Sequence, residues 1–281
     1  MPSSEDADQE IQTPSAKRRE PIFDAPAVVV GLAVLLLAIH GAMNLLSDAW
    51  QDDVARQLAF IPGRLTIALW PNELQHLLAR ANEDPNALRQ AVMLRHFHIV
   101  EDGAKIWTLL TYAFLHGGWT HVGLNVIWLA AFGPPVARRI GPVRFLLLFA
   151  ATAIAGALVH WAFNWLDFTP LIGASAGVSG LMAAATRFVF EPGAPLGAPA
   201  YSPAAPRDDF PAAPPLRRLL RERRVLTFLA VWFIANFIFG AGAQTFGLSE
   251  GPVAWLAHVG GFALGFLAFP LFDRRTVGPA A

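Results

Sequence analysis

Six apolar segments of about membrane-spanning length alternate with polar or mixed segments along the chain. A bilayer has a hydrocarbon core about 30 Å thick, and a helix needs about 20 apolar residues to cross it. The fourth segment is the shortest and is rich in Ala and Gly, which membrane helices use where they pack closely. The six segments cover residues 25–46, 106–132, 143–163, 173–190, 225–243 and 253–272. The pattern predicts an all-α membrane protein with six transmembrane helices.

The polar segments predict how the rest of the chain is organised. The N-terminal segment is charged and lacks periodicity, which is typical of disorder. The stretch before the fifth apolar segment is rich in Pro, Ala and Gly, as flexible linkers are. In chain order, we expect a disordered N-terminus (1–24), a membrane domain (25–272) and a tail (273–281), with a long loop (47–105) and a linker (191–224) inside the domain.

The long loop contains two amphipathic stretches that predict short helices, over residues 71–81 and 85–97. Asp84 is suited to cap the second helix, with Pro85 at its first position. Each stretch has one apolar face. We therefore expect both helices to lie in the membrane interface.

The positions of Lys and Arg predict the orientation. With six spans, 15 of the 21 basic residues fall on the side that carries both termini, and 6 fall on the other side. Cytoplasmic loops are enriched in Lys and Arg, so both termini are expected in the cytoplasm. The first apolar segment is too long for the core of a signal peptide, which favours an uncleaved anchor.

Composition excludes several classes of site. The chain is 54% apolar and only 15% charged, which is unusual for a soluble domain. It contains no cysteine, so disulfides and thiolate metal sites are excluded. A formal net charge of zero gives no indication of nucleic-acid binding. The sequence indicates no cofactor, no metal and no particular oligomeric state, and the lipid bilayer is the expected surrounding.

Polar groups are costly in a membrane, so the polar residues of the apolar segments are candidates for function, and three segments carry them at informative spacing. In the second segment, His121 and Asn125 are four residues apart and share one helix face. The fourth segment begins with Ser175 between glycines, where the N–H groups of a helix N-terminus could bind an oxyanion. The sixth contains His258 among small residues that let another helix approach.

Helix geometry predicts that these residues lie at one depth. At 1.5 Å per residue, Ser175 and His258 lie about 24 and 22 Å from the cytoplasmic ends of their helices, and His121 and Asn125 at roughly 20–25 Å. Small residues recur in both helices at a spacing that favours close packing. They are Gly173, Gly177 and Gly180 in the fourth segment, and Gly261 and Gly265 in the sixth. We therefore expect the serine to meet the histidine.

These motifs, in this order, resemble the rhomboid family of intramembrane serine proteases, of the bacterial six-span type. The resemblance covers roughly residues 25–272. Its markers are His116, His121 and Asn125, the glycine-flanked Ser175, and Ala257-His258 followed by Gly261 and Gly265. It implies regulated intramembrane proteolysis of transmembrane protein substrates, in the bacterial inner membrane.

The resemblance also implies roles for these residues. Ser175 would attack the scissile carbonyl, and His258 would accept its proton. His121, Asn125 and the N–H of Ser175 would stabilise the oxyanion. No acidic residue lies in the spans near His258, so a Ser–His dyad is expected in place of a triad.

Neighbouring residues receive supporting roles. His116 is expected to make a structural hydrogen bond at the entrance of its helix. Asn236, in the fifth segment, is expected to line the water cavity that hydrolysis requires.

Three positions depart from the family pattern. Ala176 follows the serine where the family usually has Gly, and its methyl group could shift the oxyanion N–H. Ala137 replaces a glutamate that commonly forms an ion pair. Arg64 or Trp70 only partly replaces the Trp-Arg pair of the first loop.

The same residues leave other functions to compare with proteolysis. Ala176 leaves open the alternative of a catalytically silent rhomboid-like protein that binds membrane proteins without cutting them. A transporter or channel is disfavoured, because charged residues occur in the spans only near their ends, at Arg144 and Arg187, and the sequence has no repeated half. A metal-dependent intramembrane protease would need a His-Glu-x-x-His helix, which the sequence lacks.

Overall fold

The computed structural model describes residues 25–190, 213–242 and 254–273. Within these residues the regular secondary structure is helical, apart from one antiparallel bridge between Phe60 and Leu171, and loops or turns join the helices. The expected disordered N-terminus lies outside the described residues, as do residues 191–212 of the predicted linker and 274–281 of the predicted tail.

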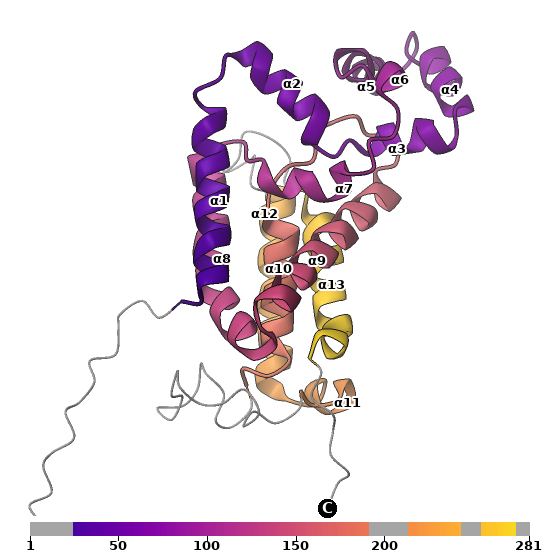
Figure 1. Cartoon of the computed structure of the whole chain (residues 1–281). Helices are drawn as coiled ribbons and strands as arrows, with labels where there is room; N and C mark the ends of the chain where they lie inside the picture. Colours follow the sequence, from indigo (N-terminus) through magenta and orange to yellow (C-terminus); the bar gives the residue numbers. More distant parts are fainter. Residues whose placement is uncertain (1–24, 191–212, 243–253, 274–281) are drawn as a thin grey trace, which may run out of the picture.

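A bundle of long helices carries a layer of short helices at one end (Figure 1). The long helices are α1 (Ala27–Met43), α8 (Trp119–Ile140), α9 (Pro142–Phe163), α10 (Ser175–Thr186), α12 (Arg223–Gly242) and α13 (Trp255–Phe272). The end layer contains α2 (Asp48–Leu58), α3 (Pro62–Leu69), α4 (Asn72–Arg80), α5 (Pro85–His96) and α6 (Ile99–Asp102). Two short elements, α7 (Thr108–Thr111) and η1 (Tyr112–Phe114), lead from this layer into the bundle, and α11 (Leu216–Leu219) lies at the opposite end (Figure 1).

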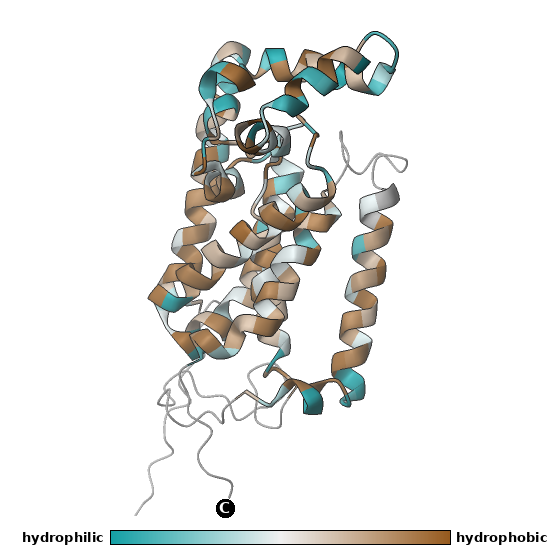
Figure 2. Ribbon diagram, turned by 90° about the vertical axis from the view of Figure 1, so that its right-hand side faces the viewer, coloured by the Kyte–Doolittle hydropathy of each residue, from teal (hydrophilic) through white to brown (hydrophobic). Residues whose placement is uncertain are grey.

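Apolar residues cover most of the bundle, whereas polar residues gather in the end layer and at the opposite end (Figure 2). By length and composition, α9 and α13 could each cross a membrane, and α1 is a shorter apolar helix. The predicted all-α class is confirmed. The number of spans remains a prediction, as does their orientation.

The second apolar segment differs from the single helix expected over 106–132. It contains α7, η1 and a turn before α8 begins at Trp119. Gly117 and Gly118 lie in this turn, and glycine is among the residues least favourable to a helix. The helix then continues to Ile140, where Gly141 adopts a φ of 80° that favours glycine and ends the helix.

The boundaries of the predicted linker and tail also differ from the expectation. Residues 213–224, expected in a linker, contain α11 and the start of α12, and Leu219 packs in a cluster with Phe262 and Phe266. Asp273, expected in the tail, is buried and forms an ion pair with Arg139, with 2.7 Å between Nη2 and Oδ2. Ala137 stands where the family commonly has a glutamate, and an ion pair is present two residues later, at Arg139. Its acidic partner is Asp273.

The two helices expected in the long loop are present as α4 and α5. Leu77 and Leu94 pack with Phe168 in a small core of their own, so part of each apolar face is buried within the end layer. Asp84 caps α5 as expected, because its side chain accepts a hydrogen bond from the N–H of Asn86 at 2.8 Å. The sequence did not predict α2, α3 and α6.

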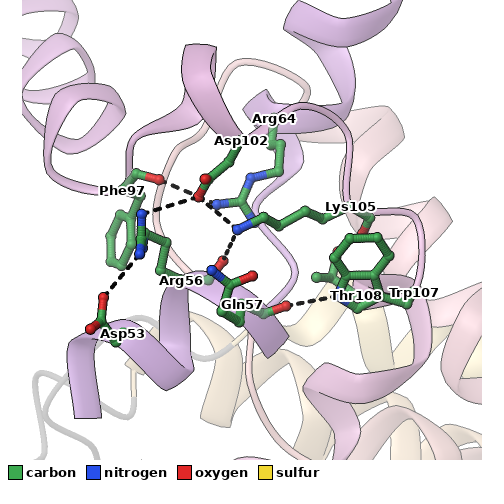
Figure 3. Close-up of polar contacts among 9 residues, drawn as sticks. All are labelled: Asp53, Arg56, Gln57, Arg64, Phe97, Asp102, Lys105, Trp107 and Thr108. Carbon is green, nitrogen blue, oxygen red and sulfur yellow. Dashed lines mark hydrogen bonds and ion pairs between the residues drawn. The ribbon is translucent and has the colours of Figure 1, made fainter. Parts of the chain in front are cut away.

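A polar cluster holds the end layer together above the bundle (Figure 3). The Nζ of Lys105 donates to the carboxylate of Asp102 at 2.6 Å, and a guanidinium nitrogen of Arg56 lies 3.6 Å from the same oxygen. Arg64 is buried and donates to the carbonyl of Phe97. Burial lowers the pKa of Arg64 to about 10, so the group is still charged at neutral pH.

Asp102 is the anionic centre of this cluster. Burial alone would raise its pKa, but the hydrogen bond and charge of Lys105, with the charges of Arg56 and Arg64, hold the pKa below its ordinary value. A carboxyl group with a lowered folded-state pKa stabilises the fold above its unfolded pKa, about 3.9, and this contribution is lost as the pH falls through the folded value.

We therefore expect Asp102→Asn to loosen the end layer at pH 7. The free energy of unfolding should fall by about 1–3 kcal/mol, because the buried cations Lys105 and Arg64 lose their carboxylate. Hydrogen exchange over residues 48–105 would measure this, and acidification below pH 4 should produce the same loosening in the wild type. Asp53→Asn is the control, because Asp53 forms an exposed pair with Arg56 and such pairs contribute little. Equal exchange in wild type and Asp102→Asn at pH 7 would contradict the assignment.

Candidate active site

Ser175 occupies the first position of α10, directly after a loop that is fixed by hydrogen bonds. Gly173 in this loop has a φ of 118°, which L-residues with a side chain rarely adopt. Its N–H donates to the carbonyl of Tyr112 at 3.0 Å. The next N–H, of Ala174, donates to Nε2 of His116 at 3.3 Å. The turn before α8 and the element η1 therefore hold the backbone that presents the serine.

His258 comes from α13 and lies against Ser175. Its Nε2 is 2.8 Å from the Oγ of the serine. Its other ring nitrogen, Nδ1, is 2.7 Å from Oδ1 of Asn236 on α12. A serine hydroxyl that can donate to an unprotonated imidazole nitrogen is the arrangement that activates it as a nucleophile.

His121 lies beside the same loop, on the side of Gly173. A Cβ atom added at Gly173 would be 2.7 Å from Nε2 of His121 and 3.8 Å from Oγ of Ser175, so both side chains border the space next to this glycine. Nδ1 of His121 accepts a long hydrogen bond, 3.5 Å, from the N–H of Gly117. In this tautomer Nε2 carries the proton and can donate into that space.

Asn125 lies one turn further along α8 and is buried. Its amide donates to the carbonyl of His121 at 2.9 Å, which is a contact within the helix. Ser175, His258 and His121 are thus brought together by three different helices and the loop before α10, and Asn125 contacts the backbone of His121 one helical turn away.

Glycines let α13 lie directly on α10. A Cβ at Gly261 would overlap the backbone carbonyl of Ala176, and one at Gly265 would overlap that of Gly180. On another side of α10, Gly177 faces the ring of Phe149 from α9. The contacts at Gly261 and Gly265 are backbone against backbone, and they set the separation of the helices that carry Ser175 and His258.

The methyl group of Ala176 has a place in this packing. The residue is buried, and its Cβ faces Gly156 of α9, where an added Cβ would lie only 2.5 Å away. Among the described residues, positive φ values outside glycine occur only at His98 and Lys105, so Ala176 has an ordinary helical backbone. The start of α10 therefore keeps its helical backbone even though alanine, in place of the family's usual glycine, follows the serine.

The contact of Asn236 with His258 was not predicted from the sequence. The residue was noticeable as an amide in an apolar helix, but its partner could not be found from spacing within one helix. The hydrogen bond joins residues 22 positions apart on two helices.

We expect Gly265→Ala to lower the thermal stability of the detergent-solubilised protein by about 1–3 kcal/mol, because the new methyl group meets backbone that cannot turn aside. Gly123→Ala in α8 is the matched control. No atom lies within 4 Å of its added Cβ, so stability should stay unchanged or rise by up to about 1 kcal/mol. Similar losses in both variants would show that contact with α10 is not the cause.

Comparisons with known proteins agree on one family. The family model described as "Rhomboid domain" matches residues 103–275, more than half of the chain. The human protein named Rhomboid-related protein 3 is 39% identical over 82 residues, which are 29% of this chain and 20% of that protein. The putative rhomboid protease YdcA of Bacillus subtilis is 36% identical over 75 residues, 27% of this chain and 37% of that protein.

A longer match is to the rhomboid protease GlpG of Serratia proteamaculans, 23% identical over 171 residues, which are 61% of this chain and 49% of that protein. The matched part thus spans less than half the length of each of these three relatives.

Proposed function

Because this chain belongs to the rhomboid family of membrane proteins, we propose that it is an intramembrane serine endopeptidase that cleaves transmembrane segments of other membrane proteins. The observation that carries the proposal is the 2.8 Å contact between Oγ of Ser175 and Nε2 of His258. Relatives that are named as proteases support it.

In the proposed reaction, Oγ of Ser175 attacks the scissile carbonyl carbon while Nε2 of His258 takes the hydroxyl proton. The same nitrogen then gives this proton to the leaving amine, and the C–N bond breaks to leave an acyl-enzyme. A water molecule, deprotonated by His258 in its turn, hydrolyses the ester and restores the serine.

The oxyanion of the tetrahedral intermediate would lie in the space beside Gly173. One donor, Nε2 of His121, borders that space. We assign the N–H of Ser175, which is one of the first N–H groups of α10, as the second donor. Such N–H groups have no partner within their own helix and are available to an anion. Asn125 would support this site through its hydrogen bond to the backbone of His121.

The surroundings of the site suggest the substrate class. The apolar exterior of the bundle suits lipid, so a peptide bond within another transmembrane segment is the expected target (Figure 2). The distribution of Lys and Arg supports an orientation with both termini in the cytoplasm and the end layer outside. The bacterial inner membrane is the location that the family resemblance implies.

Ser175→Ala and His258→Ala should each abolish cleavage of a labelled transmembrane substrate in detergent, because the nucleophile or its base is lost. Ser179→Ala, one turn further along the same helix, is the matched control and should remain active. Circular dichroism would check that every variant is folded. If folded wild-type protein cleaves none of several transmembrane substrates, the protein is better described as a binding factor without protease activity.

His121→Ala should lower kcat by about 10²–10³, the usual effect of removing one oxyanion donor, while KM changes little. His121→Gln keeps a side-chain N–H and should retain more activity than the alanine variant. Steady-state cleavage kinetics of the three proteins would test this. A kcat of wild-type size in His121→Ala would exclude the imidazole from the oxyanion site.

A further inference from the structure

Asn236 places a polar side chain from α12 on the ring nitrogen of His258 that faces away from Ser175. Oδ1 of the amide is 2.7 Å from Nδ1 of the ring. At the other end of the amide, Nδ2 donates to the carbonyl of Trp255 at 3.3 Å. Trp255 and His258 are three residues apart on α13 and therefore share one face. One partly buried amide thus bridges two neighbouring points of the helix that carries the histidine.

The contact with Trp255 determines which way the amide is turned. Only the NH₂ group of asparagine can donate to a carbonyl oxygen, and the opposite orientation would set two oxygen atoms against each other. Oδ1 therefore faces His258 and accepts a hydrogen bond there. It follows that Nδ1 of His258 carries the proton and that Nε2 has its lone pair toward Oγ of Ser175.

We propose that Asn236 is a positioning residue, which holds His258 in the tautomer and ring orientation that accept the proton of Ser175. This inference deepens the proposed protease function and rests on it. After proton transfer, Nδ1 of the imidazolium still donates to Oδ1, so the amide dipole also favours the charged ring. Asn236 provides the acceptor that a carboxylate provides in a Ser-His-Asp triad, but without the cost of placing a carboxylate in a membrane helix.

The helix that supplies this acceptor lies at the edge of the bundle (Figure 2). Its inner side contacts α13 through aromatic rings, among them Trp232 stacked on Phe262 at 4.0 Å. Its outer side is exposed and apolar, as at Val231, Ile234 and Ile238. The orientation of the His258 ring therefore depends on α12 staying docked against α13.

The kinetic test compares Asn236→Leu, which removes the acceptor at similar size, with Asn236→Asp, which keeps an acceptor. We expect kcat for a transmembrane substrate to fall about tenfold in the leucine variant, the rate equivalent of one hydrogen bond, with KM unchanged. Covalent labelling by a small fluorophosphonate should slow by the same factor. This probe reacts with the serine without binding of a transmembrane substrate, so it tests the dyad alone. The aspartate variant should be faster than the leucine variant in both assays. Thr227→Val, a polar-to-apolar change at an exposed position of α12, is the control and should behave as wild type.

A second measurement does not depend on activity. In protein labelled with ¹⁵N-histidine, the ring shifts of His258, assigned with a His258→Gln sample, report which nitrogen carries the proton. We expect protonated Nδ1 in the wild type and in Ser175→Ala, and a loss of that preference in Asn236→Leu. Protonated Nε2 in the wild type, or an unchanged tautomer and unchanged rates in Asn236→Leu, would overturn the role of Asn236. Failure of the wild type to cleave or take the label would instead refute the protease function, and the tautomer would still decide the role of the amide.

Discussion

The backbone contact between α10 and α13 is the constraint on which the proposed site depends. Gly261 and Gly265 of α13 lie against backbone carbonyl groups of α10, so closely that a Cβ atom at either glycine would overlap them. At this separation the imidazole of His258 on α13 reaches the hydroxyl group of Ser175 on α10, with 2.8 Å between Nε2 and Oγ. Gly156 extends the same arrangement to α9 and makes room for the methyl group of Ala176. The contact between Ser175 and His258 therefore depends on the glycines between α10 and α13 as well as on the two side chains.

The polar groups inside the bundle mostly satisfy one another. His258 bonds on one side to Ser175 and on the other to Asn236, and His116 accepts a hydrogen bond from the loop before the serine. Charged side chains are found at the two ends instead, in the Arg139–Asp273 pair and in the cluster around Asp102. This division follows from cost, since an uncharged network can be buried in an apolar bundle more cheaply than an ion. The proposed nucleophile and base, a serine and a histidine bonded to an amide, fit this rule because all three side chains can be uncharged.

Much of this arrangement could be predicted from the sequence, because it depends on regular helix geometry. The spacing of small residues indicated which two helices meet, and depth arithmetic put Ser175 and His258 at one level. What could not be predicted depends on contacts between distant segments. The start of α8 is set by a glycine turn inside an apolar run, so hydropathy placed it too early. Asn236 showed only as an isolated amide, because its role is defined by a residue on another helix. The end layer has a small core of its own, which amphipathic periodicity alone did not reveal.

The most direct test of the central claim is to map where a fluorophosphonate reacts with the folded wild-type protein. Such a probe labels a serine only when a base activates it. Digestion and mass spectrometry should find the adduct on Ser175 alone, and none on the neighbouring Ser179. An adduct distributed over several serines, or no adduct on protein that is shown to be folded, would contradict the account of Ser175 as a nucleophile activated by His258.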